Sequence, residues 1–213
     1  MPFPIILSSP SGGGKTTIAH QLLSVRSDVG YSVSCTTRSA RVGEIHGEDY
    51  YFRSLEDFTR GREAGEFAES AEVHGHLYGT LRAEVEQVLA SGKHVIMDID
   101  VQGARQFAAS FPDSVLIFIL PPSAEVLVGR LSARGSEDRE SLIRRFRSAK
   151  DELKAVDLYS YVVVNDEIGH AVQAISGIIE AEGLKSSRDG ALDRRVSDLM
   201  SGIQRAIDHY SER

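Results

Sequence analysis

The chain has 213 residues, 41% of them hydrophobic and 26% charged, and its formal net charge is −7 at pH 7. This length suits one domain with insertions or two small domains, with enough apolar residues for a substantial core. The negative charge argues against general nucleic-acid binding, which needs a basic face, and no apolar run reaches the 18 residues that would indicate a membrane span.

A phosphate-binding loop is predicted near the start of the chain, at residues 9–17. An apolar run at 5–7 predicts a buried strand, and a helical pattern follows at 15–25. A strand, a glycine-rich loop and Gly-Lys-Thr before a helix form the context in which such a loop is credible. Glycines let backbone N–H groups close around phosphate oxygens, and the helix N-terminus adds partial positive charge. We expect Lys15 to reach the outer phosphates of a nucleotide and the Thr16 hydroxyl to bind Mg²⁺.

Small or donor-bearing residues dominate this loop. Those expected to contact a nucleotide are Ser9, Pro10, Ser11, Gly12, Gly13, Gly14, Lys15, Thr16 and Thr17. The usual pattern opens with glycine where this chain has Ser9, and serine lacks glycine's free access to positive φ. The alternative interpretation is a flexible loop before an ordinary helix, which the flanking strand and helix disfavour.

Strands and helices alternate along most of the chain. Apolar runs predict strands buried on both faces at 5–7, 94–97, 115–120 and 161–164. Helical patterns lie at 15–25, 81–90, 101–109, 123–134, 138–158 and 168–181. This alternation predicts an α/β fold, in which helices flank both faces of a mostly parallel sheet.

Residues 32–79 interrupt the alternation and predict an inserted mixed α/β subdomain. Short alternating patterns indicate strands at 31–36, 49–52 and 67–73. A helix is expected after Ser54, where Asp57 completes a capping box. Cys35, the single cysteine, is interpreted as a small packed residue rather than a reactive thiol. A single cysteine excludes an internal disulfide and is typical of a reducing cytoplasm.

Two arginines three residues apart follow Cys35. Arg38 and Arg41 could share one phosphate dianion, because guanidinium groups bind phosphate in bidentate fashion. Tyr50 and Tyr78 are phenols that could donate to the same group. Each residue alone is more typical of a surface or a core, but beside a phosphate loop the four predict a second phosphate site.

The predicted strand at 94–97 leads into two carboxylates, Asp98 and Asp100. Residues i and i+2 of a strand point to the same face, and the carboxyl end of a strand beside a phosphate loop suits a hydrated Mg²⁺ or a ligand donor. We therefore expect Asp98 to join Thr16 at the metal, through water. The alternative is a strand-end turn, where aspartate is common. His74 and His76 lack a third ligand at sensible spacing and are interpreted as loop residues.

The segment 130–150 is basic within an acidic chain. Its seven basic residues are Arg130, Arg134, Arg139, Arg144, Arg145, Arg147 and Lys150, against three acidic ones, Glu137, Asp138 and Glu140. This local charge suggests an anionic ligand, and the alternative is a solvated helix face with i,i+4 ion pairs. Charge alone does not choose between the two.

An amphipathic helix is predicted at the C-terminal end, within 187–213. Its apolar residues recur at helical spacing and are Leu192, Val196, Leu199, Ile203 and Ile207. Such a stripe must cover something, either this domain or a partner chain.

Together these motifs resemble those of the guanylate kinases, P-loop nucleoside monophosphate kinases that transfer a phosphoryl group from ATP to GMP. The resemblance is carried by the segments 32–44, 47–52, 77–80, 98–103, 130–135 and 163–166 and covers roughly residues 4–181. It implies a P-loop core formed by 1–31, 81–125 and 157–182, a GMP-binding subdomain at 32–80 and a helical lid at 126–156. Residues 183–213 would form a C-terminal helical extension.

The resemblance also implies roles for individual residues. Those implied to hold the GMP phosphate are Arg38, Arg41, Tyr50 and Tyr78, and those implied to surround guanine are Ser34, Glu69, Thr80 and Asp100. Glu69 could accept both the N1–H and the 2-amino group of guanine, donors that adenine lacks. The implied lid arginines are Arg130, Arg134 and Arg145, with Arg144 as a neighbour, and Asn165 and Asp166 fall near the adenine. Lys15, Arg38, Arg41 and the lid arginines are the implied catalytic residues.

Three other functions are alternatives to this interpretation. Another nucleoside monophosphate kinase would share the layout. A guanylate-kinase-like protein-binding module would be expected to have lost the loop or the GMP contacts, which stand here. A GTPase-type switch would need an Asn-Lys-x-Asp segment, which the sequence lacks. We expect ATP and GMP as the partners, no nucleic acid or membrane, self-association through the C-terminal helix as an open option, and the cytoplasm as the location.

Overall fold

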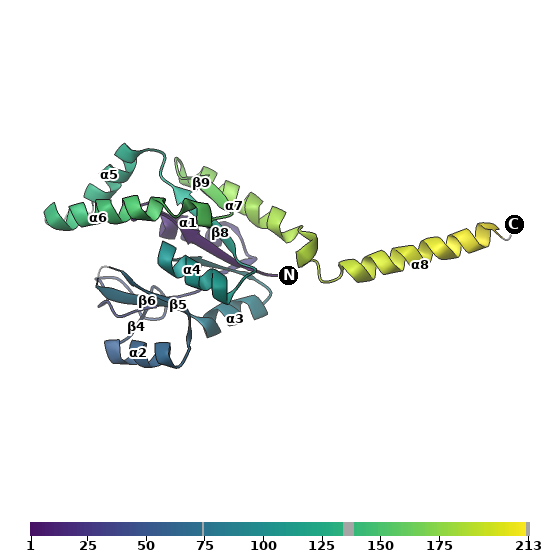
Figure 1. Ribbon diagram of the computed structural model, residues 1–213, viewed down its shortest axis with the longest axis horizontal. Coiled ribbons are helices and arrows are strands. Elements are labelled where there is room, and N and C mark those ends of the chain that lie inside the picture. Colours follow the sequence, from purple (N-terminus) through teal and green to yellow (C-terminus); the bar gives the residue numbers. More distant parts are fainter. Residues whose placement is uncertain (74, 134–138, 212–213) are drawn as a thin grey trace. The chain divides into compact units, whose positions relative to one another are not determined.

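The computed structural model describes residues 1–73, 75–133 and 139–211 (Figure 1). The chain forms two compact units, Pro2–Ser176 and Gly177–Arg213, and Met1 belongs to the second. The larger unit holds both sheets and all the predicted site residues that the structure describes. The candidate functional site therefore lies in the larger unit.

A parallel five-stranded sheet forms the core of the larger unit. Its strands, in spatial order, are β2 (Val29–Tyr31), β7 (His94–Asp98), β1 (Pro4–Ser8), β8 (Val115–Leu120) and β9 (Tyr161–Val164). β1 pairs in parallel with β7 on one side and β8 on the other. The predicted parallel sheet and its four predicted strands are confirmed. Because β1 is central and all its residues are buried, the loop that follows it emerges at the middle of the carboxyl edge.

Helices cover both faces of this sheet, as period-two alternation along buried strands requires. On one face Ile6 and Phe118 pack with Phe107 of α4 (Val101–Ser110) and with Val85 of α3 (Arg82–Ala90). On the other, α1 (Lys15–Val25) contacts β1 and β7 and buries Ile18, Ala19 and Leu22. These contacts fix the start of α1 beside the carboxyl ends of β1 and β7.

β9 differs from the other predicted strands because it lies at the sheet edge. The side chains of Val162 and Val164 are 48% and 47% exposed. The prediction that this strand is buried on both faces is therefore wrong. An apolar run of four residues does not distinguish an edge strand from a central one.

The inserted region forms a second sheet. Its spatial order is β4 (Tyr51–Phe52), β3 (Ser34–Thr36), β6 (His76–Leu81) and β5 (Phe67–Val73). β6 is antiparallel to β3 and β5, whereas β3 and β4 are parallel. The single strand predicted at 31–36 is wrong, because the chain leaves the core sheet after Tyr31 and enters the second sheet at Ser34.

A small apolar cluster supports the second sheet. Phe58 of α2 (Leu55–Glu63) stacks on Phe67 with ring centroids 4.4 Å apart, next to the buried Cys35. Ser54 caps α2 by accepting the Asp57 N–H at 3.0 Å. The reciprocal half of the predicted capping box differs, because the Asp57 carboxylate accepts the Ser54 hydroxyl and not its N–H.

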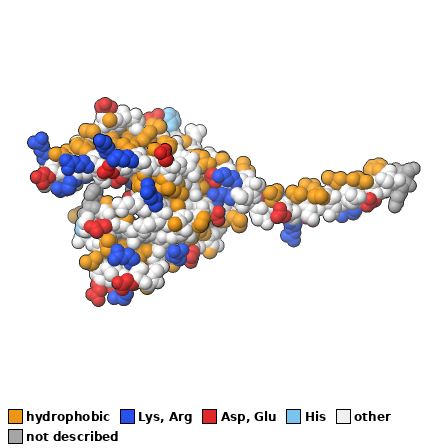
Figure 2. Space-filling view, in the orientation of Figure 1, with side chains coloured by type: hydrophobic (Ala, Val, Ile, Leu, Met, Phe, Trp, Pro, Cys, Tyr) orange, Lys and Arg blue, Asp and Glu red, His pale blue; other side chains and the backbone are white. Residues whose placement is uncertain are grey.

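Two helices follow β8, namely α5 (Ala124–Ser132) and α6 (Arg139–Leu153), joined by the apolar contacts of Leu127, Leu131 and Ala149. α6 ends earlier than predicted, and a 3-10 turn, η1 (Val156–Leu158), replaces the rest of the helix predicted at 138–158. Lys and Arg side chains gather over α6 in Figure 2. α7 (Ile168–Gly183) follows β9 and contains the boundary between the two units.

The smaller unit contains η2 (Ser186–Arg188) and α8 (Leu192–Ser211). Glu182 forms ion pairs with Lys185 at 2.6 Å and Arg188 at 3.2 Å, and the Met1 ammonium donates to the Arg188 carbonyl. α8 confirms the predicted amphipathic helix, and hydrophobic side chains line one edge of it (Figure 2). Its exposed apolar residues are Val196, Leu199, Met200, Ile203, Ile207 and Tyr210. Within the described ranges, none of the helices combines the length and hydrophobicity needed to span a lipid bilayer.

Candidate active site

The predicted phosphate loop joins β1 to α1 as the sequence indicates. Gly12 and Gly14 have φ of +80° and +93°, values that side chains disfavour, and Gly14 is the N-cap of α1. Lys15 Nζ donates to the carbonyl and the hydroxyl of Ser9, both at 3.2 Å, across the loop. The loop therefore closes around the lysine and directs the N-terminus of α1 toward whatever anion it binds.

Ser9 fits the loop without the freedom of glycine. It is 2% exposed, and its hydroxyl donates to the Pro10 carbonyl at 2.8 Å. A Cβ at Gly13 would lie only 2.6 Å from Ser9 Cβ. The serine side chain at position 9 therefore fits because position 13 is glycine, which has no side chain to clash with it.

Asn165, which directly follows β9, packs against the same loop. Its Nδ2 donates to the Gly13 carbonyl at 2.9 Å, and a Cβ at Gly14 would meet this nitrogen at 2.6 Å. Asn165 is 2% exposed. Asn165 therefore stabilises the conformation of the phosphate loop, whereas its contact with adenine stays a prediction.

Asp98, at the end of β7, reaches across to the start of α1. The Thr16 hydroxyl donates to one carboxylate oxygen, and the Tyr31 hydroxyl donates to the other at 2.5 Å. Burial, and then the carboxylate of Asp98, raise the pKa of Tyr31 well above its usual range. The predicted pair Thr16 and Asp98 is thus adjacent, and sequence analysis missed Tyr31, which it had assigned to a different strand.

These oxygens fit Mg²⁺, which favours carboxylate and hydroxyl ligands in combination with phosphates and water. Within the described ranges, no group of three or more His, Cys, Asp or Glu side chains could hold a metal. A magnesium ion here would therefore complete its coordination with the nucleotide and water. Asp98 and Thr16 are the residues that would orient it.

The second predicted phosphate site lies in the 38–50 loop and on β6. Arg38 makes a bidentate ion pair with Glu44, at 2.8 and 2.9 Å, and its guanidinium lies 5.4 Å from the centre of the Tyr50 ring. The Tyr50 and Tyr78 rings meet edge to face at 6.0 Å. Burial raises the pKa of Tyr50 to about 12, which keeps the phenol a hydrogen-bond donor at neutral pH. Arg38, Tyr50 and Tyr78 therefore come together as predicted.

Arg41 differs from them in being exposed, and its backbone N–H donates to Glu44 at 2.7 Å. No hydrogen bond of its side chain is seen among the described residues. That this side chain shares a phosphate with Arg38 stays a prediction.

The predicted guanine contacts converge where the two sheets meet. Glu69 of β5 is 5% exposed and accepts the Thr80 hydroxyl at 2.7 Å. Burial raises the pKa of Glu69 to about 7, although the hydrogen bond from Thr80 lowers it. A Cβ at Gly103 of α4 would lie 2.5 Å from Glu69 Oε2, so the carboxyl group occupies space that only glycine leaves open. Asp100 caps α4 by accepting the N–H groups of Gln102 and Gly103.

One cavity of about 250 Å³ connects these clusters. Its lining combines loop, metal-site and guanine-site residues, namely Ser11, Lys15, Thr16, Tyr31, Ser34, Tyr50, Glu69, Val73, Tyr78, Gly79, Asp98, Ile99, Asp100 and Glu152. The start of α1 and the predicted guanine contacts therefore face a common space.

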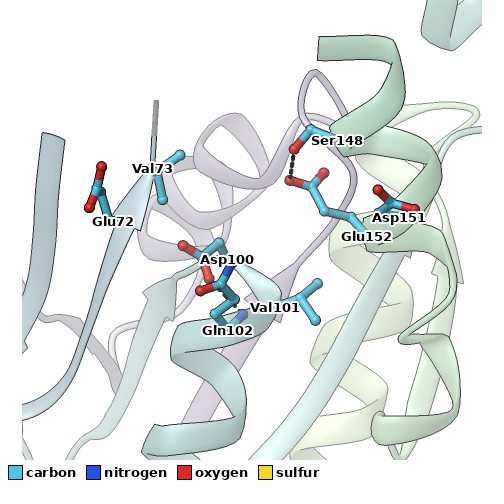
Figure 3. Close-up of a pocket in the computed structure, with 8 residues that line it drawn as sticks. All are labelled: Glu72, Val73, Asp100, Val101, Gln102, Ser148, Asp151 and Glu152. Carbon is cyan, nitrogen blue, oxygen red and sulfur yellow. Dashed lines mark hydrogen bonds between the residues drawn. The ribbon is translucent and has the colours of Figure 1, made fainter. Parts of the chain in front are cut away.

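A neighbouring cavity of about 330 Å³ lies between β5, the start of α4 and the end of α6 (Figure 3). Glu152 of α6 lines both cavities and accepts the Ser11 N–H at 2.8 Å and the Ser148 hydroxyl at 3.1 Å. Sequence analysis missed Glu152. Its contact links the last turn of α6 to the phosphate loop.

The predicted lid arginines are placed differently from one another. Arg145 is 7% exposed and donates to the Leu131 carbonyl, so it joins α6 to α5. Arg130 donates to the Asn165 carbonyl at 3.5 Å, and its Nη1 is buried without a hydrogen-bond partner in the described residues. Arg144 is exposed, and Arg134 lies outside the described residues. None of the three described arginines lines the shared cavity, so their approach to ATP stays a prediction.

Comparison with known proteins gives a consistent result. The sequence model described as guanylate kinase matches residues 1–182. The guanylate kinase of Geobacter sulfurreducens is 46% identical over 92% of this chain and 95% of its own length. That of Symbiobacterium thermophilum is 46% identical over 88% and 89%. The crystal structure of guanylate kinase from Anaplasma phagocytophilum is 36% identical, with a TM-score of 0.76 over 91% of this chain and 92% of that one.

Proposed function

The chain belongs to the guanylate kinase family, and we propose that its phosphate loop holds ATP while the Arg38 and Glu69 clusters hold GMP. As a member of this family it is a nucleoside monophosphate kinase, which transfers a phosphoryl group from ATP to GMP. The observation that carries the assignment of the two sites is the shared cavity. Lys15 and Thr16 line it together with Ser34, Glu69 and Tyr78.

Guanine recognition is proposed to depend on the ionised carboxylate of Glu69. This group can accept the adjacent N1–H and 2-amino donors of guanine, while Ser34 or Thr80 serves the O6 acceptor. Adenine would leave the buried carboxylate without its donors, which costs a site built on polar pairing a factor of ~10⁴. Glu69 already accepts the Thr80 hydroxyl, so it is held in position before the base binds.

Phosphoryl transfer in this arrangement needs no general base. The attacking oxygen belongs to a phosphate whose second pKa is about 6, so it is already ionised near neutral pH. The barrier lies instead in bringing two anions together. Lys15, Arg38 and Arg41 are proposed to offset that repulsion and to stabilise the charge spread over the transferred group. Bound Mg²⁺, held by Thr16 and, through water, by Asp98, would supply further positive charge.

We also propose that residues 32–80 bind GMP and that 126–156 act as a lid bearing Arg130, Arg134 and Arg145, with Asn165 near the adenine. Closure would exclude water, which would otherwise accept the phosphoryl group. Small-angle scattering with and without a bisubstrate analogue tests the movement. Identical curves would contradict it.

One assay tests the assignment of the reaction. Purified protein with ATP and Mg²⁺ is expected to release ADP only after GMP is added, with much slower release on addition of AMP, CMP or UMP. ADP release that does not depend on any nucleoside monophosphate would contradict the proposed hand-over between the two sites.

Self-association through α8 is proposed as the role of its exposed apolar edge. The segment 187–213 carries five arginines and five acidic residues, so its balanced charge favours a protein surface over an anionic one. Light scattering of the full chain and of Leu199→Asp would test this, because a loss of mass only in the variant is expected.

The cytoplasm is the proposed location, since both substrates and a single reduced thiol suit it.

A further inference from the structure

Glu44 contacts the proposed GMP site but has no role in the reaction described so far. Its carboxylate binds the Nη1 and Nη2 groups of Arg38 at 2.9 and 2.8 Å, and also accepts the Arg41 N–H at 2.7 Å. The side chains of Arg38 and Glu44 are only 12% and 18% exposed. The Arg38–Glu44 ion pair is therefore largely shielded from solvent and held by several hydrogen bonds, unlike an exposed surface pair.

The contacts of Arg38 leave one particular edge of its guanidinium available. An arginine has five N–H donors in a planar fork. Both donors of Nη1 are used, one on Glu44 and one on the Ser39 carbonyl at 2.7 Å, and one donor of Nη2 is used on Glu44. The donors that Glu44 and Ser39 leave are Nε–H and the second N–H of Nη2, and the Tyr78 phenol, itself a predicted ligand of the phosphate, also hydrogen-bonds to the Arg38 side chain. These two N–H donors lie side by side, so they form a second bidentate edge that matches two phosphate oxygens.

The surroundings of Arg38 favour this one orientation. Its guanidinium lies 5.4 Å from the Tyr50 ring centre and 5.8 Å from that of Phe52. Glu44 and then Tyr78 raise the pKa of Arg38, so the charge is fully retained. The carboxylate itself is positioned by a turn in which the Glu44 N–H donates to the Arg41 carbonyl at 3.1 Å.

We propose that Glu44 is a positioning residue, which holds the end of the Arg38 guanidinium so that its Nε–Nη2 edge faces the phosphate of the bound nucleotide. The inference rests on the proposed function, in which Arg38 contacts the GMP phosphate. The opposite arrangement, in which Glu44 competes with the phosphate, is disfavoured because the Nε–Nη2 edge is not occupied by Glu44. The carboxylate therefore has no need to leave when GMP binds.

Glu44→Gln tests the proposal with the smallest change of shape. An amide can accept from only one Arg38 nitrogen and presents its own N–H groups to the other, so the guanidinium loses its fixed orientation. The KM for GMP is expected to rise roughly tenfold, the order expected for a hydrogen bond to a charged group, while the KM for ATP stays unchanged. Glu48→Gln, an equal charge change in the same loop, is expected to leave both values unaltered.

Binding of guanosine separates positioning from a general structural effect. Guanosine lacks the phosphate, so its dissociation constant, measured by calorimetry, is expected to be the same in Glu44→Gln and the unaltered protein. A parallel loss of guanosine and GMP affinity would overturn the proposal, because it would mean that the subdomain itself is disturbed. Tighter GMP binding in Glu44→Gln would overturn it as well, because that is the result expected of a competing carboxylate.

A double-mutant cycle with Arg38→Ala distinguishes this inference from the proposed function. If Glu44 acts through Arg38, adding Glu44→Gln to Arg38→Ala raises the KM for GMP no further. If Arg38→Ala leaves the KM for GMP unchanged, the proposed phosphate contact is wrong. If Arg38→Ala raises it but Glu44→Gln does not, the contact stands and only the role of Glu44 is overturned.

Discussion

The phosphate loop and the Arg38 loop both offer donors to a phosphate, but they build these donors from different parts of the chain. In the first, backbone N–H groups and a helix end converge because glycines allow tight turns and close packing. In the second, side chains converge because Glu44, Tyr50 and Tyr78 surround one guanidinium.

The difference shows in how each region responds to its neighbours. Within the phosphate loop Ser9 lies against Gly13, and from outside it Asn165 and Leu131 lie against Gly14 and Gly12, so packing determines the conformation of the loop. The Arg41 side chain, in contrast, is exposed and is not enclosed by packing in this way. We therefore expect changes in the phosphate loop to disrupt geometry and changes in the Arg38 loop to weaken individual contacts.

The largest effect is expected at Lys15, the charged residue of the phosphate loop. Lys15→Ala should lower kcat by about 10³-fold, the order seen when a preorganised transition-state contact is removed, while GMP still binds. Steady-state kinetics and GMP calorimetry measure the two effects, with Lys93→Ala as a control. A variant that retained most of its turnover would contradict the proposed role of Lys15.

Glu69 tests whether guanine is read by a single buried carboxylate. Glu69→Gln should raise the KM for GMP roughly 30-fold, because an amide cannot accept both guanine donors, and should weaken discrimination against AMP. In the unaltered protein, GMP affinity should fall as the pH drops below about 7, where the carboxyl becomes protonated. The variant should lose the Glu69 contribution to that pH dependence.

The same carboxyl also predicts how stability changes with pH. The folded pKa of about 7 exceeds the ordinary value of 4.5, so the folded state binds more protons between these values. The contribution of Glu69 to stability is therefore greatest below about pH 4.5 and decreases as the pH rises to 7. Chemical unfolding of Glu69→Gln should show a smaller decrease over this interval, and equal slopes would contradict the burial argument.

Gly13→Ala tests whether packing determines the conformation of the phosphate loop. Its new Cβ would meet Ser9, so the KM for ATP should rise by about tenfold to thirtyfold, as overpacking costs typically 1–3 kcal/mol. Adding Ser9→Gly should restore part of the loss, because it removes the closest atoms. Gly129→Ala, where a Cβ meets nothing within 4 Å, is the control. Failure of Ser9→Gly to rescue would mean that the strain lies elsewhere.

The smallest effect is expected at Arg41. Arg41→Met should raise the KM for GMP roughly tenfold and lower kcat less, because one charged contact is lost from an otherwise intact cluster. Arg62→Met on the exposed side of α2 serves as the control. Unchanged kinetics would remove Arg41 from the site.

Local patterns predicted the fold well where one element determines its own form. The four apolar strands, the loop and the start of α1 follow from hydrophobic runs and from Gly-Lys-Thr. Periodicity could not show that the chain changes sheets between Tyr31 and Ser34, because Tyr31 continues the alternation of the next strand. It also could not show that β9 is an edge strand, since neighbours in a sheet are set by the whole topology.

The sequence likewise proposes only those site residues that belong to a local motif. Residues within a motif, such as Lys15, Thr16 and Arg38, could be proposed from the sequence because each motif has its own spacing. Tyr31, Glu44 and Glu152 were missed because their partners come from the folded chain: Asp98, Arg38 and the Ser11 N–H. A partly buried carboxylate that pairs with an arginine leaves no signal in a single sequence.

The buried Cys35 makes the chain convenient for distance measurements. It is the only cysteine, it is fully buried, and burial raises the pKa of its thiol to about 11, so reagents that attack thiolates will react with it slowly. Cysteines introduced at exposed positions, such as Arg62 on α2 and Arg144 on α6, can therefore carry a pair of fluorophores in the otherwise natural sequence. Energy transfer between them would test whether the two helices approach each other during turnover.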